Sequence, residues 1–530
     1  MNDDEIIKFR QYEFKYNINN KTPKEKNFLR FTIIIKYIII IIAILYLYYS
    51  YSNIIKNIIK HFNNNDFNNN NNIIENKEDD DINNIDILNK QKENCEEIDP
   101  INLYSKRIEN GPIEICKGQN TKHICYANFN NYYNEIFAHK NGVICEMENI
   151  ILDPSKSEQS GLSYKGPIDF MNLGFPILHK GFFNTKCDIE NPLINYNEIY
   201  NTYFDSWDYN YNKNENLEEL SPGKTILFLS RNQDSPNLYH GNCEIINIIA
   251  IMNLFNLIPE RVQVVFLESI KIPKDPFYDM YKNMISKGGE PIFIRNLKKK
   301  YKISKAIHVP INWDSPAYLN LELPKCDSST KTYKLYNDFI NKYLDIKKYN
   351  EKFISDGEVF YYPKEIIEKN NLSKNNFNFT KIITIQWRKV WPKGRQGQFR
   401  ILGNGKQLTN KLVQKIPKNK NFLIRLIDTA KLPMREQISI IKNTDYLVGI
   451  HGAGLSLSIF LPKNSILHEV LHSDNLKVLS MMSKMSGHVT YSDIINAEVK
   501  NIRGNEYVFF DENEFCKKVI EHMKENNYFE

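Results

Sequence analysis

The stretch DYLVGIHGAGLSLSIFLP (residues 445–462) decides how the second half of this chain is interpreted. An apolar run typical of a buried strand ends at Ile450. The turn His451-Gly452-Ala453-Gly454 follows, and then a short amphipathic segment predicts a helix that begins near Leu455. Glycines let a backbone approach a ligand closely, and the free N–H groups at a helix start favour an anion. Taken alone, the turn is compatible with a structural bend or with an anion site.

A second motif, HEVLH at residues 468–472, matches the H-E-x-x-H pattern of zinc proteases. That pattern requires a helix, on which two histidines four residues apart bind one zinc ion. Here polar, turn-forming residues leave room for about two helical turns, and the apolar positions suit a strand. On a strand, His468 and His472 would stand about 13 Å apart, which is too far for one ion. A zinc protease that uses His468, Glu469 and His472, with His488 as a third histidine, stays as an alternative interpretation.

Strands and helices alternate beyond residue 220, which predicts parallel α/β sheets. The predicted strands occupy residues 225–229, 262–267, 381–385, 422–427, 446–450 and 465–470, and the predicted helices occupy residues 244–256 and 434–443. We expect an N-terminal domain at 96–350, a polar linker at 351–378 and a C-terminal domain at 379–530. The final helix of the C-terminal domain could pack back onto its partner domain.

The first hundred residues differ from the rest and predict a membrane anchor. Residues 31–51 are almost wholly Ile, Leu, Tyr and Ala, which is long enough to span a bilayer. Lysines and an arginine precede this run, so residues 1–30 should form a cytosolic tail. Residues 52–95 are rich in Asn and acidic groups and predict a flexible stalk. This layout predicts a single-pass type II protein of the Golgi or ER membrane, whereas a cleaved signal peptide lacks its small-residue cleavage site.

Cysteines and glycosylation sequons fit a luminal location for the folded part. All eight cysteines follow the predicted anchor, five of them between residues 95 and 187, and the even number permits full pairing. Asn371 and Asn378 begin N-x-S/T sequons and are predicted glycosylation sites. The net charge of +6, from 69 basic and 63 acidic side chains, is dispersed, so no nucleic-acid partner is expected.

Several blocks together resemble the signature of glycosyltransferase family 61. They comprise residues 443–455, the nearby Phe460-Leu-Pro462 and the run Ile466-Leu-His-Glu469-Val. Two further blocks occur in the order typical of the family, NLYHGNCEIIN at 237–247 and the pair IQWR at 385–388 and RILGN at 400–404. The resemblance extends from residue 220 to residue 490 and is greatest to the group of EGF-domain-specific O-GlcNAc transferases and β-1,2-xylosyltransferases.

The resemblance implies a GT-B fold, in which two Rossmann-like domains face a cleft and the C-terminal one binds a nucleotide sugar. It also implies that the donor diphosphate lies on the glycine turn, with arginines binding its oxygens and Glu469 binding the ribose or the sugar. The implied donor-binding residues are Arg388, Arg400, His451, Gly452, Ala453, Gly454, Leu455 and Glu469. Arg395 is an alternative to Arg400, because that block is lengthened in this chain. No metal or other cofactor is expected, since positive groups can stabilise the leaving diphosphate.

An inverting transfer requires one base to take the proton of the acceptor hydroxyl. His240 and Glu244 lie four residues apart and would share one helix face, so either could be that base. Glu244 is preferred, with His240 positioning the acceptor, and Asn237 and Asn247 are candidates for hydrogen bonds to the acceptor.

The expected function is therefore an inverting, metal-independent transfer of GlcNAc or xylose. The donor would be a UDP-sugar, and the acceptor a hydroxyl of a glycoprotein or glycan in the secretory pathway. A catalytically inactive glycan-binding relative is a further alternative to the zinc protease.

Overall fold

The computed structural model describes residues 95–118, 120–126, 143–158, 177–190, 203–211, 215–230, 237–267, 275–287, 289–310, 326, 328–344, 346, 359–362, 381–389, 400–417, 420, 422–429, 432–473 and 478–530. The chain separates into two compact units, residues 1–83 and 84–530, and every described residue belongs to the second. The predicted tail, the predicted membrane span, the stalk up to residue 94 and both sequons, Asn371 and Asn378, lie outside the described residues. None of the helices that the structure describes is long and apolar enough to cross a membrane.

The first sheet has ten strands in the order β11-β10-β9-β12-β3-β2-β1-β7, with β6 and β8 beside β3. Its strands are β1 (Ile113–Lys117), β2 (Lys122–Tyr126), β3 (Ile144–Leu152), β6 (Phe183–Asn184), β7 (Ile189–Glu190), β8 (Trp207–Asp208), β9 (Thr225–Leu229), β10 (Val262–Phe266), β11 (Ile292–Phe293) and β12 (Tyr301–Val309). Strands β9 to β12 are parallel, and β9 and β10 are the two strands predicted here. Strands β1 to β3 pair antiparallel, so only the parallel part of this sheet is Rossmann-like.

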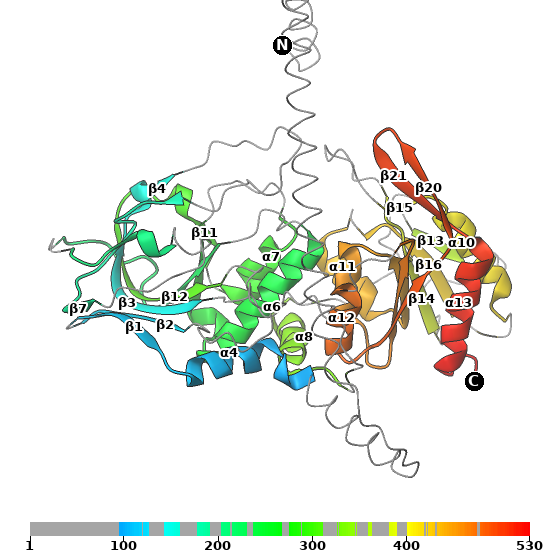
Figure 1. The fold of residues 1–530 in the computed structure, drawn as a ribbon, viewed down its shortest axis with the longest axis horizontal. Coiled ribbons are helices and arrows are strands. Elements are labelled where there is room, and N and C mark those ends of the chain that lie inside the picture. Colours follow the sequence, from blue (N-terminus) through cyan, green and yellow to red (C-terminus); the bar gives the residue numbers. More distant parts are fainter. Residues whose placement is uncertain are drawn as a thin grey trace, which may run out of the picture. The chain divides into compact units, whose positions relative to one another are not determined.

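Helix α6 (Leu238–Leu254) is the central helix beside this sheet. It begins six residues before the predicted start, because Asn237 caps it: the side-chain oxygen accepts a bond of 3.1 Å from the Tyr239 N–H. The helix is apolar on nearly all sides, and almost all its side chains are buried. Helices α4 (Pro100–Glu109) and α8 (Lys331–Tyr343) lie against it (Figure 1). The shorter elements of this half are η1 (Pro154–Lys156), β4 (Ser157–Glu158), β5 (Ile177–Leu178), η2 (Pro259–Arg261), α7 (Tyr278–Met280), η3 (Tyr281–Ile285) and η4 (Ile294–Asn296).

The second sheet has the order β13-β16-β14-β17-β18-β19 and is parallel except for its edge strand β13. Its strands are β13 (Val359–Tyr362), β14 (Lys381–Gln386), β16 (Phe422–Ile427), β17 (Tyr446–Ile450), β18 (Ile466–Leu471) and β19 (Val489–Ile494). Four of these strands match predicted ones, since strands buried on both faces form continuous apolar runs. Strand β13 lies inside the segment predicted as a linker, so that segment contributes to this sheet.

Helices cover both faces of the second sheet (Figure 1). Helices α11 (Met434–Lys442) and α12 (Val478–Met485) pack on one face, and α10 (Gly405–Lys415) and α13 (Glu512–Glu525) on the other. A small sheet of β15 (Ile401–Leu402), β21 (Asn505–Phe510) and β20 (Ala497–Ile502) completes this half. The segment after the glycine turn differs from the prediction: it is the 3₁₀ helix η8 (Ala453–Phe460) and not an α-helix that begins near Leu455.

The two halves share one apolar core. Cys243 of α6 and Leu455 and Phe460 of η8 belong to the same cluster of buried side chains. The Asn242 side chain donates a bond of 2.9 Å to the Ser456 hydroxyl across this contact. The predicted boundary between two domains is therefore not a break in the hydrophobic core.

Three disulfides connect Cys95 with Cys326, Cys116 with Cys187 and Cys125 with Cys145. Cys243 and Cys516 are buried free thiols, so the full pairing that the even number permits does not occur.

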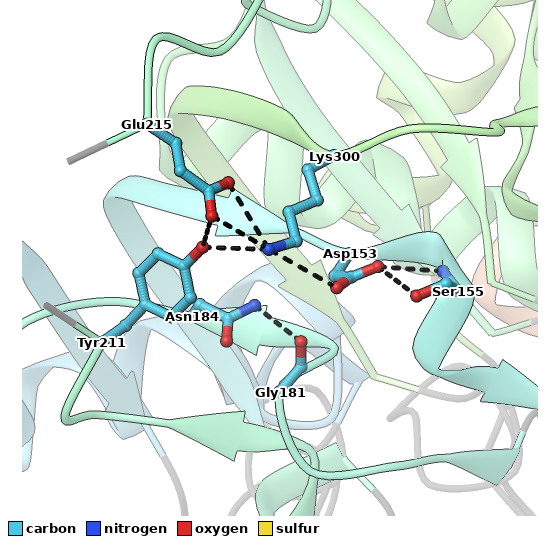
Figure 2. Close-up of polar contacts among 7 residues, drawn as sticks. All are labelled: Asp153, Ser155, Gly181, Asn184, Tyr211, Glu215 and Lys300. Carbon is cyan, nitrogen blue, oxygen red and sulfur yellow. Dashed lines mark hydrogen bonds and ion pairs between the residues drawn. The ribbon is translucent and has the colours of Figure 1, made fainter. Parts of the chain in front are cut away.

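A polar network joins loops around the first sheet (Figure 2). The Lys300 ammonium donates to the Tyr211 hydroxyl at 3.0 Å and to Glu215 at 3.3 Å, and it lies 4.0 Å from Asp153. The Tyr211 hydroxyl donates to the same Glu215 carboxylate at 2.7 Å. Each of these polar groups has a hydrogen-bond or ion-pair partner within the network, so the network stabilises the loops.

Candidate functional site

The candidate site lies where parallel strands β14, β17 and β18 end. Gly449 is the register partner of both Gln386 on β14 and Glu469 on β18. Arg388 follows β14 by two residues and His451 follows β17 directly. Ligands of open α/β sheets bind at the carboxyl ends of the strands. The order of the sheet therefore brings Arg388, the glycine turn and Glu469 to one edge.

Side chains from β14 fill the space beside the glycine turn. A Cβ at Gly452 would stand 1.8 Å from Arg388 Nη1, and a Cβ at Gly454 would stand 2.3 Å from Gln386 Nε2. Arg388 Nη1 donates to the backbone oxygen of His451 at 3.0 Å. The glycines are thus required for close packing of two polar side chains against the turn. Gln386 was not predicted, although it stands in the same IQWR block as Arg388.

His451 and Glu469 form a pair at the same edge. The Glu469 carboxylate is fully buried, and its Oε1 contacts His451 Nδ1. The Ser492 hydroxyl lies 3.4 Å from the other carboxylate oxygen. A buried carboxylate at Nδ1 fixes the orientation of the imidazole ring. In this arrangement Glu469 positions His451, and its predicted contact with ribose or sugar stays a prediction.

Arg400 stands two residues before Leu402, whose N–H donates to the Arg388 backbone oxygen at 2.9 Å, and its side chain interacts electrostatically with Glu469 and Glu506. Its φ of +60° is unusual for a residue other than glycine. Glu506 of β21 accepts a bond of 3.1 Å from the Arg400 N–H and so holds this conformation. Burial lowers the pKa of Arg400, and the Glu506 and Glu469 carboxylates act in the opposite direction. Arg395, the alternative, lies outside the described residues.

Glu506 was not predicted, because it reaches the site from a hairpin about a hundred residues beyond Arg400. Its Oε1 also lies 3.8 Å from His472 Nε2. Burial lowers the pKa of His472, which favours a neutral ring. No local sequence signal marks a glutamate whose role depends on the pairing of β15 with β21.

The HEVLH motif lies on strand β18 and just beyond it, as predicted. Its two histidines have separate surroundings: His468 is buried beside Asp493, whereas His472 lies beside Glu506. Burial lowers the pKa of His488 to about 4. The helical arrangement that a zinc protease of this type requires is therefore absent from the motif, whose residues are all described.

The predicted acceptor residues lie on or beside α6, which packs against η8. Asn242 is the α6 side chain that bonds to Ser456 of η8. His240 and Glu244 each lie two residues from Asn242 along α6. Because an α-helix turns about 100° per residue, both side chains point about 160–200° away from Asn242 around the helix. Glu244 is 3% exposed. Both candidates thus lie on a helix that packs against η8, but on a different face from Asn242.

Asn237 and Asn247 have structural partners. Asn237 caps α6. The Asn247 side chain accepts from the Tyr104 hydroxyl and donates to the Pro310 oxygen at 3.1 Å. Their predicted bonds to an acceptor stay predictions.

Comparison with known proteins gives the family of this site. Residues 290–467 match the family described as Glycosyltransferase 61. A segment of 78 residues is 27% identical to the EGF domain-specific O-linked N-acetylglucosamine transferase of Drosophila melanogaster, and it covers 15% of this chain and 15% of that protein. The family match includes Arg388, Arg400 and the glycine turn, while α6 and Glu469 lie outside it. Residues 290–467 are therefore similar to glycosyltransferase family 61.

Proposed function

We propose that this chain is a glycosyltransferase that takes its sugar from a nucleotide-sugar donor. The observation that carries the proposal is the meeting of Arg388, Arg400 and the His451–Glu469 pair with the glycine turn. Arginines bind the paired oxygens of phosphates well, and a diphosphate is the leaving group of a nucleotide sugar. The matched family range supports the same activity.

The donor diphosphate would bind at the glycine turn, between Arg388, Arg400 and His451, whose ring can donate a hydrogen bond to it. The two arginines stabilise the charge that develops as the diphosphate leaves, and they are fixed before the reaction begins. Glu469 keeps His451 oriented toward that position. Positive side chains can thus supply the stabilisation that a divalent metal provides in other transferases, so we propose a metal-independent reaction.

The acceptor hydroxyl would approach from the side of α6. One base is needed for a single displacement with inversion, and Glu244 or His240 would take the proton. Glu244 lies on α6 and is 3% exposed.

The sugar and the compartment complete the proposal. UDP-GlcNAc or UDP-xylose would be the donor, and a glycoprotein or glycan hydroxyl the acceptor. The name of the Drosophila relative supports GlcNAc. Three disulfides are typical of an oxidising compartment, which supports the lumen of the ER or Golgi. Residues 31–51 would then anchor the chain as a type II membrane protein.

Donor hydrolysis by the full-length chain tests the proposal. A panel of UDP-sugars is assayed for UDP release, with and without added Mn²⁺ or Mg²⁺, in the wild type and in Arg388→Ala. We expect one sugar to be preferred, release without added metal, and a loss of about 100-fold or more in Arg388→Ala. Binding of UDP without any turnover would instead favour an inactive, glycan-binding relative. A strict requirement for added Mn²⁺ would refute the metal-independent reaction.

A further inference from the structure

Three side chains from distant parts of the sequence meet at the first histidine of the HEVLH motif. His468 lies on β18, Asp493 on β19 and His522 on the C-terminal helix α13. Asp493 Oδ2 lies 3.0 Å from His468 Nε2 and 2.5 Å from His522 Nε2. All three atoms lie within 4.8 Å of one another. Two imidazole nitrogens and a carboxylate oxygen are a ligand set that zinc accepts.

The ring of each histidine is held in place by neighbouring groups. His468 Nδ1 lies 3.0 Å from the Tyr446 hydroxyl, and histidines that bind metals usually bond to an oxygen through their second nitrogen, which directs the first toward the ion. The His522 ring is stacked on by the Tyr491 ring, and its Nδ1 lies 3.6 Å from Glu525 without a hydrogen bond. The Nε2 atoms of both rings lie beside Asp493 Oδ2.

Asp493 is held in the manner of a ligand that binds through one oxygen. Its Oδ1 lies 3.4 Å from the Lys518 ammonium, which leaves Oδ2 for the two imidazoles.

Hydrogen bonds among His468, Asp493 and His522 do not explain the position of His468. Its Nε2 is completely buried and lies 3.0 Å from Asp493, but it is not aligned for a hydrogen bond and has no other partner. A buried polar atom without a partner is costly. Ligand atoms around a tetrahedral zinc stand about 3.3 Å apart, close to the separation of His468 and Asp493.

We propose that His468, Asp493 and His522 bind one structural zinc ion, with water as the fourth ligand. The ion would join β18 and β19 to helix α13, which covers this face of the second sheet. The site uses only the first histidine of HEVLH, and Glu469 points to the opposite face of the strand because side chains alternate. It therefore differs from a protease centre, and it does not depend on the proposed transferase activity.

The test is the zinc content of the full-length chain, purified without a polyhistidine tag. Metal is measured by plasma mass spectrometry after incubation with zinc and gel filtration. We expect about one zinc per chain in the wild type, and less than about a tenth of that in Asp493→Asn and His522→Gln. The matched control is His472→Gln, which removes the second histidine of the motif and should keep the zinc. Circular dichroism establishes that each variant is folded.

Thermal unfolding gives a second readout. Zinc should raise the Tm of the wild type and of His472→Gln, and leave the Tm of Asp493→Asn unchanged, because a ligand that binds the folded state stabilises it. The substituted amide can still bond to the imidazoles, so a trio that is only hydrogen-bonded would show no zinc effect in any of these proteins. That result, or a wild type without zinc, would overturn the proposal. Loss of zinc in His472→Gln with retention in Asp493→Asn would overturn it as well.

Discussion

The substitution Gly452→Ala tests whether the glycine turn and Arg388 act together. A methyl group at this position would stand 1.8 Å from Arg388 Nη1 and 2.9 Å from its Cζ. The backbone itself would tolerate alanine, because a φ of 171° is extended and open to any residue. The strain is therefore confined to the arginine, which must move away from the turn.

The size of the effect follows from that displacement. Contacts of a Cβ below 3.0 Å essentially never occur, so Nη1 must shift by at least the difference between 3.0 Å and 1.8 Å. Such a shift breaks the bond of 3.0 Å to the His451 oxygen. A hydrogen bond made by a charged group contributes about 1.5–3 kcal/mol. Because each 1.4 kcal/mol is about tenfold, we expect the Kd for UDP to rise about 10- to 150-fold.

Isothermal titration calorimetry with UDP measures this change, and thermal unfolding establishes that the variant is folded. Arg388→Ala should weaken UDP binding to a similar extent, and adding Gly452→Ala to it should have little further effect. Lys389→Ala is the matched control, because this neighbouring cation lies over the Trp387 ring at 3.8 Å and should leave the Kd within about threefold. A Gly452→Ala protein with the UDP affinity of the wild type would refute the reasoning.

Three further predictions concern charge and burial. Glu469→Gln keeps the shape of the side chain but replaces the carboxylate that contacts His451 Nδ1 and orients its ring, so the Kd for UDP should rise about tenfold; calorimetry showing no change would contradict this role. Arg425→Ala should lower the free energy of unfolding by about 3 kcal/mol or more in urea denaturation, because this fully buried guanidinium bonds to several oxygens; Arg435→Ala, which removes a half-exposed ion pair, should cost less than about 1 kcal/mol. Burial lowers the pKa of His488 to about 4, so this histidine takes up its proton on unfolding and stability should fall between about pH 6.5 and pH 4; His488→Gln should reduce that loss in urea denaturation at the two pH values.

The parallel strands could be predicted from the sequence because each is a continuous apolar run. The carboxyl ends of parallel strands share one edge of a sheet, but the grouping of Arg388, the glycine turn and Glu469 in one donor site was implied by the resemblance to glycosyltransferase family 61. The assignment of HEVLH to a strand is confirmed for the same reason, since its apolar positions suit a buried β18. Local periodicity thus accounts for most of the second sheet.

Features that depend on distant pairing could not be predicted. Strands β1 and β2 carry charged residues at their ends and acquire their structure from pairing with β3. The partner of each cysteine is likewise set by the fold and not by spacing. Glu506 reaches Arg400 only through the pairing of β15 with β21. The 3₁₀ geometry of η8 has no clear sequence signal, because its composition suits an α-helix equally well.

The disulfide between Cys95 and Cys326 has a consequence for the order of events during translation. The two cysteines are 231 residues apart, and helix α4, which follows Cys95, also docks through Asp99 on Thr332 at the start of α8. Ribosomes add about 5–20 residues per second, so the first helix of the folded part waits roughly 10–50 s for its partner. During that interval four other disulfide-forming cysteines emerge before Cys326 does. Correct pairing therefore requires either that these four close among themselves first or that an isomerase exchanges the early bonds.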